Sequence, residues 1–301
     1  MVGQGFIRLP LLVALLVPLL LGPGRPAEAP SARVAPPGPS VAAVQPNAFF
    51  DPALFYPGLQ VAAGQSAEPT AGRLVGGVVP HHNLAAALLS GFFVQLEERP
   101  PATVIVVGPN HENRGQAVIT GYRGWQTDFG VVETDRRLVQ ALVREGLAVV
   151  DEEALSAEHT IGALMPYLKY HAPDARLVPL ILHRDIALPQ LHRLAEALAG
   201  ELGDDRLLLA SVDFSHYLTR SEAEKKDAET LQAIEAFDLP ALMRMGPDHV
   251  DSPGSLAVLM LAMQKLGARG PHKTGHTNSG VILPSETIET TSYFTFVYLL
   301  D

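Results

Sequence analysis

The sequence of 301 residues contains no cysteine. Its absence excludes disulfide bonds, thiolate metal ligands, cysteine nucleophiles and a lipid attached to an N-terminal cysteine. Any metal ion must therefore be held by nitrogen and oxygen ligands. Three further signatures are missing: the Gly-x-Ser-x-Gly elbow of hydrolases, a phosphate-binding loop, and Gly-x-Gly-x-x-Gly after a strand.

Positive charge is also scarce, because 22 basic residues face 32 acidic ones and give a formal net charge of −10. An acidic protein is repelled by nucleic-acid phosphates and by anionic membrane surfaces. We therefore expect no nucleic-acid partner, and a small-molecule substrate is compatible with the composition. The sequence identifies no protein partner.

The apolar run Leu9–Leu21 is shorter than the roughly 18 residues expected of a membrane-spanning helix. Arg8 precedes the run and Ala27-Glu28-Ala29 follows it, which is the pattern of a secretory signal peptide over residues 1–29. We therefore expect a protein exported to the periplasm or the extracellular space. An uncleaved N-terminal anchor is the alternative, and membrane contact is expected only through this segment.

The rest of the chain divides into a linker and one domain. Residues 30–45 are rich in Pro, Ala, Ser and Val without periodicity, which is typical of a flexible linker. Residues 46–301 suit a single domain. Short β-rich runs alternate there with amphipathic segments, which predicts a layered α/β fold. The predicted strands are 74–81, 103–107, 117–120, 176–182, 207–212 and 292–299, and the predicted helices are 84–96, 134–145, 160–170, 188–202, 221–237 and 256–266.

Two of the predicted strands lead directly into histidines, through Pro80-His81 and Pro109-Asn110-His111. Proline fixes the direction of the chain where each strand ends. Ligands of open α/β sheets gather at the carboxyl ends of the strands, and histidine is the commonest metal ligand. The pattern favours a shared metal ion; the alternative is a pair of unrelated loop histidines.

Polar clusters recur along the chain in a defined order. They are Pro80-His81-His82-Asn83, Gly108-Pro109-Asn110-His111, Glu158-His159-Thr160, Ser211-Val212-Asp213-Phe214-Ser215-His216-Tyr217 and Val250-Asp251-Ser252-Pro253-Gly254-Ser255. This ordered set resembles the Memo family, also called AmmeMemoRadiSam system protein B. The resemblance extends over about residues 46–301. It implies a single layered α/β domain with a mixed central sheet flanked by helices, similar in fold to class III extradiol dioxygenases.

The resemblance also implies a metal site in which His81 and His111 match the two histidine ligands. Many Memo proteins have a cysteine as the third ligand, and Asp251 stands in that place here. Two histidines and a carboxylate favour non-haem iron(II), whereas a cysteine would favour softer metals. Zinc or copper remains open as the divalent metal. His249 is an alternative ligand to Asp251.

Asp213 and His216 match an Asp-x-x-His pair of the family. The resemblance implies that His216 acts as an acid–base group and that Asp213 orients it or a ligand histidine. The alternatives are a histidine hydrogen-bonded in a buried turn and an aspartate that caps a helix. The predicted substrate pocket is lined by Glu158, His159, His82 and Asn110.

These assignments lead to three functional hypotheses. The first is an exported metalloprotein with one divalent metal, iron(II), that oxidises a small phenolic substrate with dioxygen. The second is a non-catalytic metal- or peptide-binding module. The third is a zinc-dependent hydrolase that uses Glu158 or His216 as the base beside a metal-bound water.

Overall fold

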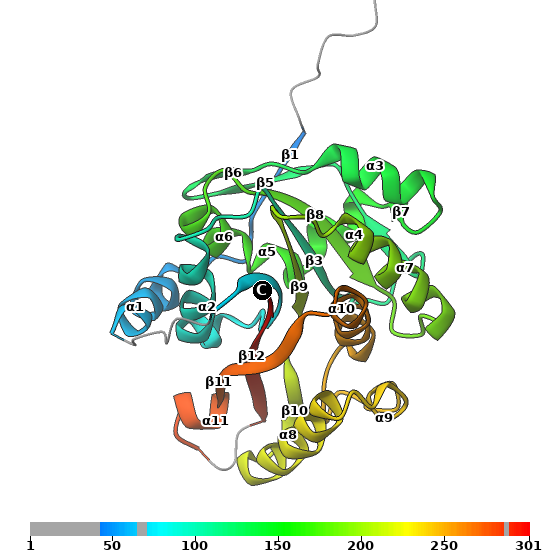
Figure 1. Cartoon of the computed structure of the whole chain (residues 1–301). Helices are drawn as coiled ribbons and strands as arrows, with labels where there is room; N and C mark the ends of the chain where they lie inside the picture. The colour runs from blue at the N-terminus through cyan, green and yellow to red at the C-terminus, as the bar shows by residue number, and fades with distance from the viewer. Residues whose placement is uncertain (1–42, 65–70, 286–288) are drawn as a thin grey trace, which may run out of the picture. The chain divides into compact units, whose positions relative to one another are not determined.

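The main sheet contains nine strands among the described residues, and helices lie on both of its faces (Figure 1). The structure is a computed structural model that describes residues 43–64, 71–285 and 289–301. The strands, in pairing order, are β10 (Phe214–Leu218), β12 (Thr290–Leu300), β2 (Arg73–Val79), β9 (Arg206–Ser211), β3 (Thr103–Pro109), β8 (Arg176–Leu182), β4 (Val118–Thr120) and β7 (Val149–Val150), with β11 (Arg269–Asn278) paired to β12. Strands β2, β9, β3 and β8 run parallel, and β12 and β4 flank them in antiparallel. The predicted mixed α/β sheet is thus confirmed.

A second sheet joins β1 (Val44–Pro46), β5 (Gly124–Thr127) and β6 (Gly130–Val132). Strand β1 runs parallel to β5, so the last two residues of the predicted linker are part of a strand. The predicted signal segment, residues 1–29, and residues 30–42 of the linker lie outside the described residues. No helix of the described part of the chain is long and apolar enough to cross a membrane.

Helices connect the strands and cover the sheet. They are α1 (Pro52–Ala63), α2 (Ala86–Phe93), α3 (Arg136–Arg144), α4 (Glu152–Ala157), α5 (His159–Gly162), α6 (Met165–His171), α7 (Leu188–Glu201), α8 (Arg220–Glu235), α9 (Leu239–Leu242), α10 (Pro253–Leu266) and α11 (Ser279–Ile282). Single 3₁₀ turns flank α2 on both sides and complete the predicted helix 84–96.

Strand β3 shows why the central parallel strands are largely apolar. Ile105 and Val107 belong to a core that also contains side chains of α3, α7 and α10. Val104 and Val106 belong to a second core with side chains of α2, α5 and α6. Successive side chains of a strand point to opposite faces, and both faces are covered here, so residues 104–107 of β3 are all apolar.

Three elements form where the sequence patterns do not predict them. Helix α1 contains Pro57, and β11 contains glycine, proline and lysine, which disfavour strands. Residues 214–218, interpreted as part of a polar cluster after a strand, form β10 against β12. The predicted helix 160–170 is divided into α5 and α6, and Pro166 stands in the first turn of α6. In α1, β11 and β10 pairing and packing outweigh local propensity, whereas the division of 160–170 follows the preference of proline for the first turn of a helix.

The four parallel strands end almost level with one another. The register pairs Val79 with Ser211 and Pro109 with Leu182. Because carboxyl ends of parallel strands form one edge of the sheet, the residues that follow them lie along that edge. The polar residues two positions beyond the ends of β2, β9, β3 and β8 are His81, Asp213, His111 and Arg184.

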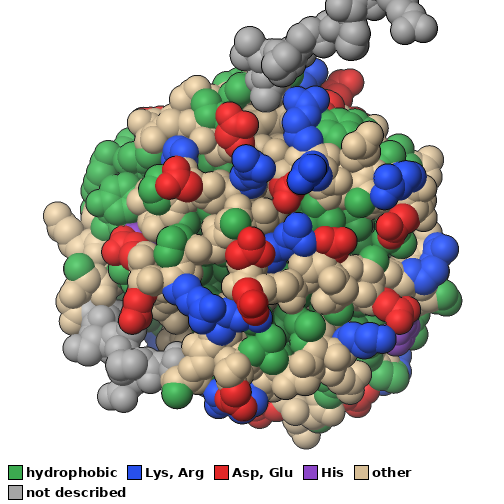
Figure 2. Space-filling model, turned by 45° about the horizontal axis from the view of Figure 1, so that its top comes forward, with side chains coloured by type: hydrophobic (Ala, Val, Ile, Leu, Met, Phe, Trp, Pro, Cys, Tyr) green, Lys and Arg blue, Asp and Glu red, His purple; other side chains and the backbone are tan. Residues whose placement is uncertain are grey.

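The surface charges are mixed on the face drawn in Figure 2. Lys and Arg side chains alternate with Asp and Glu side chains there instead of gathering by sign. A nucleic-acid site depends on clustered basic side chains. The described residues of this face form no cluster of one sign, and the absence of a nucleic-acid partner stays a prediction.

The close approach of β2 to α2 gives a stability prediction. A Cβ added at Gly77 would collide with the ring of Phe92 and lie 3.1 Å from the Phe296 carbonyl oxygen. We expect Gly77→Ala to lower the free energy of unfolding by about 1–3 kcal/mol, the usual cost of overpacking. Urea denaturation followed by circular dichroism measures the change.

Gly91→Ala is the matched control, because a Cβ at Gly91 in α2 meets no atom within 4 Å. It should leave stability unchanged or raise it by about 0.5–1 kcal/mol, since alanine is the better helix former. Equal effects of the two substitutions would contradict the described packing.

Candidate metal centre

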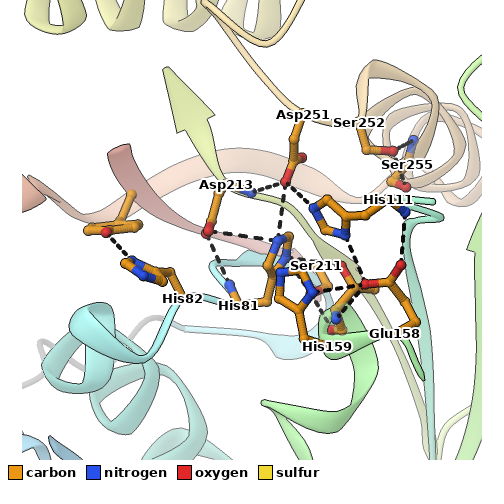
Figure 3. A network of polar contacts seen from close by, with 12 residues as sticks. His81, His82, His111, Glu158, His159, Ser211, Asp213, Asp251, Ser252 and Ser255 are labelled. Atoms are coloured by element: carbon orange, nitrogen blue, oxygen red, sulfur yellow. Dashed lines mark hydrogen bonds and ion pairs between the residues drawn. The ribbon is translucent and has the colours of Figure 1, made fainter. Parts of the chain in front are cut away.

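A cleft of about 470 Å³ lies at the carboxyl edge of the parallel strands. The histidine, aspartate and arginine side chains in its lining are His81, His82, His111, His159, His183, Arg184, Asp213, His216 and Asp251. Asn110 lines it as well, and Glu158 is buried in contact with His111 and His159. The structure thus brings the predicted site residues to one place. Figure 3 shows most of them around His81.

His81 is buried, and both of its ring nitrogens have defined partners. Nδ1 lies 3.2 Å from Ser211 Oγ and 3.2 Å from Thr160 Oγ1. The Ser211 hydroxyl donates its own proton to the Thr160 carbonyl oxygen at 2.8 Å, so its Oγ is available to accept from His81 Nδ1–H. This arrangement leaves Nε2 facing Asp251 Oδ2 at 3.2 Å.

His111 is oriented by a carboxylate. Its Nδ1 lies 2.8 Å from Glu158 Oε1, and its backbone N–H donates to Glu158 Oε2 at 2.8 Å. Burial favours protonation of Glu158, but hydrogen bonds from His111 and His159 outweigh it and hold the pKa of Glu158 well below its ordinary value. A carboxylate on Nδ1–H is the usual outer partner of a metal-binding histidine. The contact of Nδ1 with Glu158 leaves His111 Nε2 facing Asp251 Oδ2, at 3.8 Å.

Asp251 supplies the oxygen on which the two histidines converge. Its backbone N–H donates to the Asp213 carbonyl oxygen at 3.1 Å, and its Oδ2 accepts from the Asp213 N–H at 3.1 Å. The other oxygen, Oδ1, is buried and has no hydrogen-bond partner among the described residues. A buried carboxylate oxygen without a partner is costly. A cation bound by the Asp251 carboxylate and the two Nε2 atoms would offset the cost of burying this group, so these residues fit a metal ion.

The charges around His81 also favour a cation. Burial alone would lower the pKa of His81, but Asp213 and Asp251 outweigh it and raise that pKa to about 9. Asp213 Oδ2 lies 3.7 Å from His81 Nε2, and Asp213 Oδ1 accepts from the His81 N–H at 3.0 Å. Carboxylates that stabilise the extra proton on a buried imidazole would also stabilise a divalent ion that replaces that proton.

His159 lies closer to the centre than its predicted place in the pocket wall. Its ring stacks on that of His111 with centroids 4.3 Å apart and an interplanar angle of 24°. Its Nδ1 lies 3.2 Å from Glu158 Oε1. One ligand atom each from His81, His111 and His159 lies within 4.8 Å of the others. Sequence reasoning did not identify His159 as a ligand; its place directly after Glu158 is the signal that could have suggested it.

His82 and Asn110 line the cleft as predicted, and both are held by neighbours. His82 Nδ1 hydrogen-bonds to the Tyr293 hydroxyl group on β12, and burial lowers the pKa of His82. Asn110 accepts from the Arg114 N–H at 3.3 Å and donates to the Arg114 carbonyl oxygen at 2.6 Å. Asn110 therefore fixes the loop that carries His111.

The structure places His216 in the lining of the cleft and His249 outside it. His216 lines the cleft, and its Nδ1 is buried without a hydrogen-bond partner among the described residues. His249 points to α8 instead, with Nε2 2.8 Å from Glu229 Oε2. It pairs also with Asp248 at 3.1 Å. The alternative that His249 replaces Asp251 as a ligand is wrong, because His249 is engaged outside the cleft.

Comparison with known proteins finds a family model and several relatives. A family model described as Memo-like protein matches residues 62–297. A MEMO1 family protein of Methanopyrus kandleri is 32% identical over 222 residues, which are 69% of this chain and 77% of that protein. One of Methanosarcina barkeri is 27% identical over 69% of this chain and 81% of that protein. A crystal structure of an uncharacterized Escherichia coli K12 protein has 15% identity and a TM-score of 0.48, and covers 74% of this chain and 100% of that chain. The family match includes all strands and loops that carry the cluster.

The contact between Glu158 and His111 generates a prediction. Glu158→Gln keeps the size of the side chain but removes the charge that orients two imidazoles. We expect it to weaken binding of a divalent metal by about 10- to 100-fold, the usual cost of losing such a partner. Competition with a chromogenic chelator measures the affinity.

Glu97→Gln is the control, because Glu97 forms the same kind of pair with His171, at 2.7 Å, outside the cleft. Its metal affinity should equal that of the wild type. An unchanged affinity in Glu158→Gln would show that Glu158 does not orient a metal ligand.

Proposed function

Since this chain belongs to the Memo-like protein family, we propose that it is a metalloprotein that binds one divalent ion through His81, His111 and Asp251. The observation that carries the proposal is the convergence of His81 Nε2 and His111 Nε2 on Asp251 Oδ2. The buried Oδ1 without a partner supports it. His159 is a further donor beside the same ion.

The donor set supports iron(II) as the metal. Two imidazoles and a carboxylate on one side of an ion form the facial set of non-haem iron(II) oxygenases, and they leave the other positions open. The chain contains no cysteine, so the thiolate that would favour a softer metal is absent. Zinc is the alternative, because the same side chains can bind it.

Iron(II) in this cleft would supply the redox chemistry by which dioxygen oxidises a small phenolic substrate. The protein's part is to bind the substrate in the cleft and to move its proton. His216 lines the cleft, and its Nδ1 is buried, so Nε2 is the atom that would take a substrate proton. Asp213 holds the His81 backbone by accepting its N–H and keeps the ligand in place.

A zinc hydrolase that uses Glu158 as its base is disfavoured by the contacts of that residue. Glu158 Oε1 is within hydrogen-bond distance of His111 Nδ1, His159 Nδ1 and the Thr160 N–H. A carboxylate engaged in this way has little capacity to accept a proton from water. Hydrolysis would therefore depend on His216.

We also propose that the protein acts outside the cytoplasm. The signal-like segment 1–29 supports export to the periplasm or the extracellular space, with cleavage or an anchor as the two possible fates of that segment. A small-molecule substrate is compatible with a cleft of about 470 Å³, within the range of small-molecule sites.

Metal analysis of substituted proteins tests the proposal. Wild type, purified and reconstituted with iron(II) under anaerobic conditions, should hold about one ion per chain. His81→Ala, His111→Ala and Asp251→Ala each remove a ligand and should lose more affinity than the about 10- to 100-fold expected for an outer partner. His159→Ala, measured beside them, shows whether the third imidazole adds to the affinity.

His192→Ala is the matched control, because His192 is an exposed histidine on α7. Its metal content should equal that of the wild type. Undiminished metal in all three ligand variants would refute the assignment. Iron-loaded protein that takes up no oxygen with any catechol would count against oxidation, and hydrolysis by the zinc-loaded form would favour the alternative.

A further inference from the structure

Arg184 is the single arginine or lysine in the described lining of the cleft. It lies two residues beyond β8, just as His111 lies two residues beyond β3, and the register pairs Pro109 with Leu182 at the ends of these strands. Neighbouring strands lie about 4.8 Å apart. Arg184 therefore extends from the cleft wall beside the loop that carries His111.

The backbone of Arg184 is held in this position by that same loop. The Arg184 N–H donates to Asn113 Oδ1 at 2.7 Å. Asn113 has a φ of 52°, in the left-handed region that few residues other than glycine adopt. The Asn110 N–H donates to the Leu182 carbonyl oxygen at 2.9 Å. The two loops are thus braced together, and the start of the Arg184 side chain is fixed relative to His111.

The Arg184 guanidinium group has no hydrogen bond or ion pair within the described part of the chain. The acidic side chains of the Arg184 loop and of the neighbouring loop after β3 have other contacts. Asp185 is 78% exposed and lies 3.9 Å from His183 Nδ1, and Glu112 pairs with Arg114 at 3.0 Å. The carboxylates inside the cleft, Asp213 and Asp251, contact the histidines. Arg184 is therefore an exposed and unpaired cation in the described lining of the cleft.

We propose that Arg184 binds the carboxylate of a small organic acid, and that the substrate of the cleft carries such a group. This inference rests on the proposed function, because the other end of the acid faces the metal ligands. One guanidinium matches the single charge and the planar oxygens of a carboxylate. A phosphate dianion would require more positive charge than this cleft offers. The net charge of −10 repels anions in general. Binding of a carboxylate in the cleft therefore depends on Arg184.

Binding of a matched pair of probes tests the assignment. Benzoate and benzamide have almost the same shape and differ in charge. Their dissociation constants are measured by isothermal titration calorimetry with wild type, Arg184→Gln and Arg114→Gln, each in a metal-free and a zinc-loaded form. Arg114→Gln is the control, because Arg114 is exposed and already paired with Glu112. Thermal unfolding verifies that every variant is folded.

We expect wild type and Arg114→Gln to bind benzoate about tenfold or more tightly than benzamide, as charge-assisted hydrogen bonds require. Arg184→Gln should lose about 10- to 100-fold in benzoate affinity, with benzamide unchanged. No preference for benzoate in wild type, no benzoate binding, or an equal preference in Arg184→Gln would overturn the inference.

The result is separable from that of the metal analysis. If ligand substitutions leave the metal content unchanged while metal-free wild type still prefers benzoate through Arg184, the proposed metal function fails and the anion site stands. If the metal depends on His81, His111 and Asp251 while benzoate binding does not depend on Arg184, this inference alone fails.

Discussion

The level ending of four parallel strands is the constraint on which the cleft depends. Backbone hydrogen bonds fix the register of β2, β9, β3 and β8, and the two cores on either face hold that register. A single residue follows the end of each strand, and the next residue carries a polar side chain at the same edge of the sheet. His81 and His111 are thus brought together by the sheet itself, and Asp213 follows β9, the strand between theirs. A site built on such strand ends is placed more accurately than one built on long loops.

The second requirement is the orientation of the imidazoles, and buried oxygens supply it. Glu158 accepts from His111 through both of its oxygens, and it also contacts His159. A buried carboxylate is tolerated only when hydrogen bonds replace its water. These bonds satisfy the carboxylate and at the same time place a proton on Nδ1 of each ring. Ser211 acts in the same way on His81. Each ligand histidine is therefore presented with Nε2 toward the cleft.

The strand-end histidines could be predicted from sequence because uninterrupted apolar runs and following prolines mark the ends of buried strands. Asp251 could not be predicted from its own surroundings. It follows only an isolated bridge between Phe214 and Val250, and its assignment depended on family resemblance. The role of Glu158 depends on how α4 and α5 bring it behind His111, a tertiary contact without a local signal. Arg184 belongs to no motif, and only the register of β3 and β8 places it beside His111.

Anomalous X-ray diffraction at the iron edge, from crystals of the iron-reconstituted protein, tests the central claim most directly. The account predicts one strong peak at about 2.0–2.2 Å from His81 Nε2, His111 Nε2 and a carboxylate oxygen of Asp251, the usual range for nitrogen and oxygen ligands. A peak bound by other side chains, or no peak in the cleft of a protein that still carries iron, would contradict it.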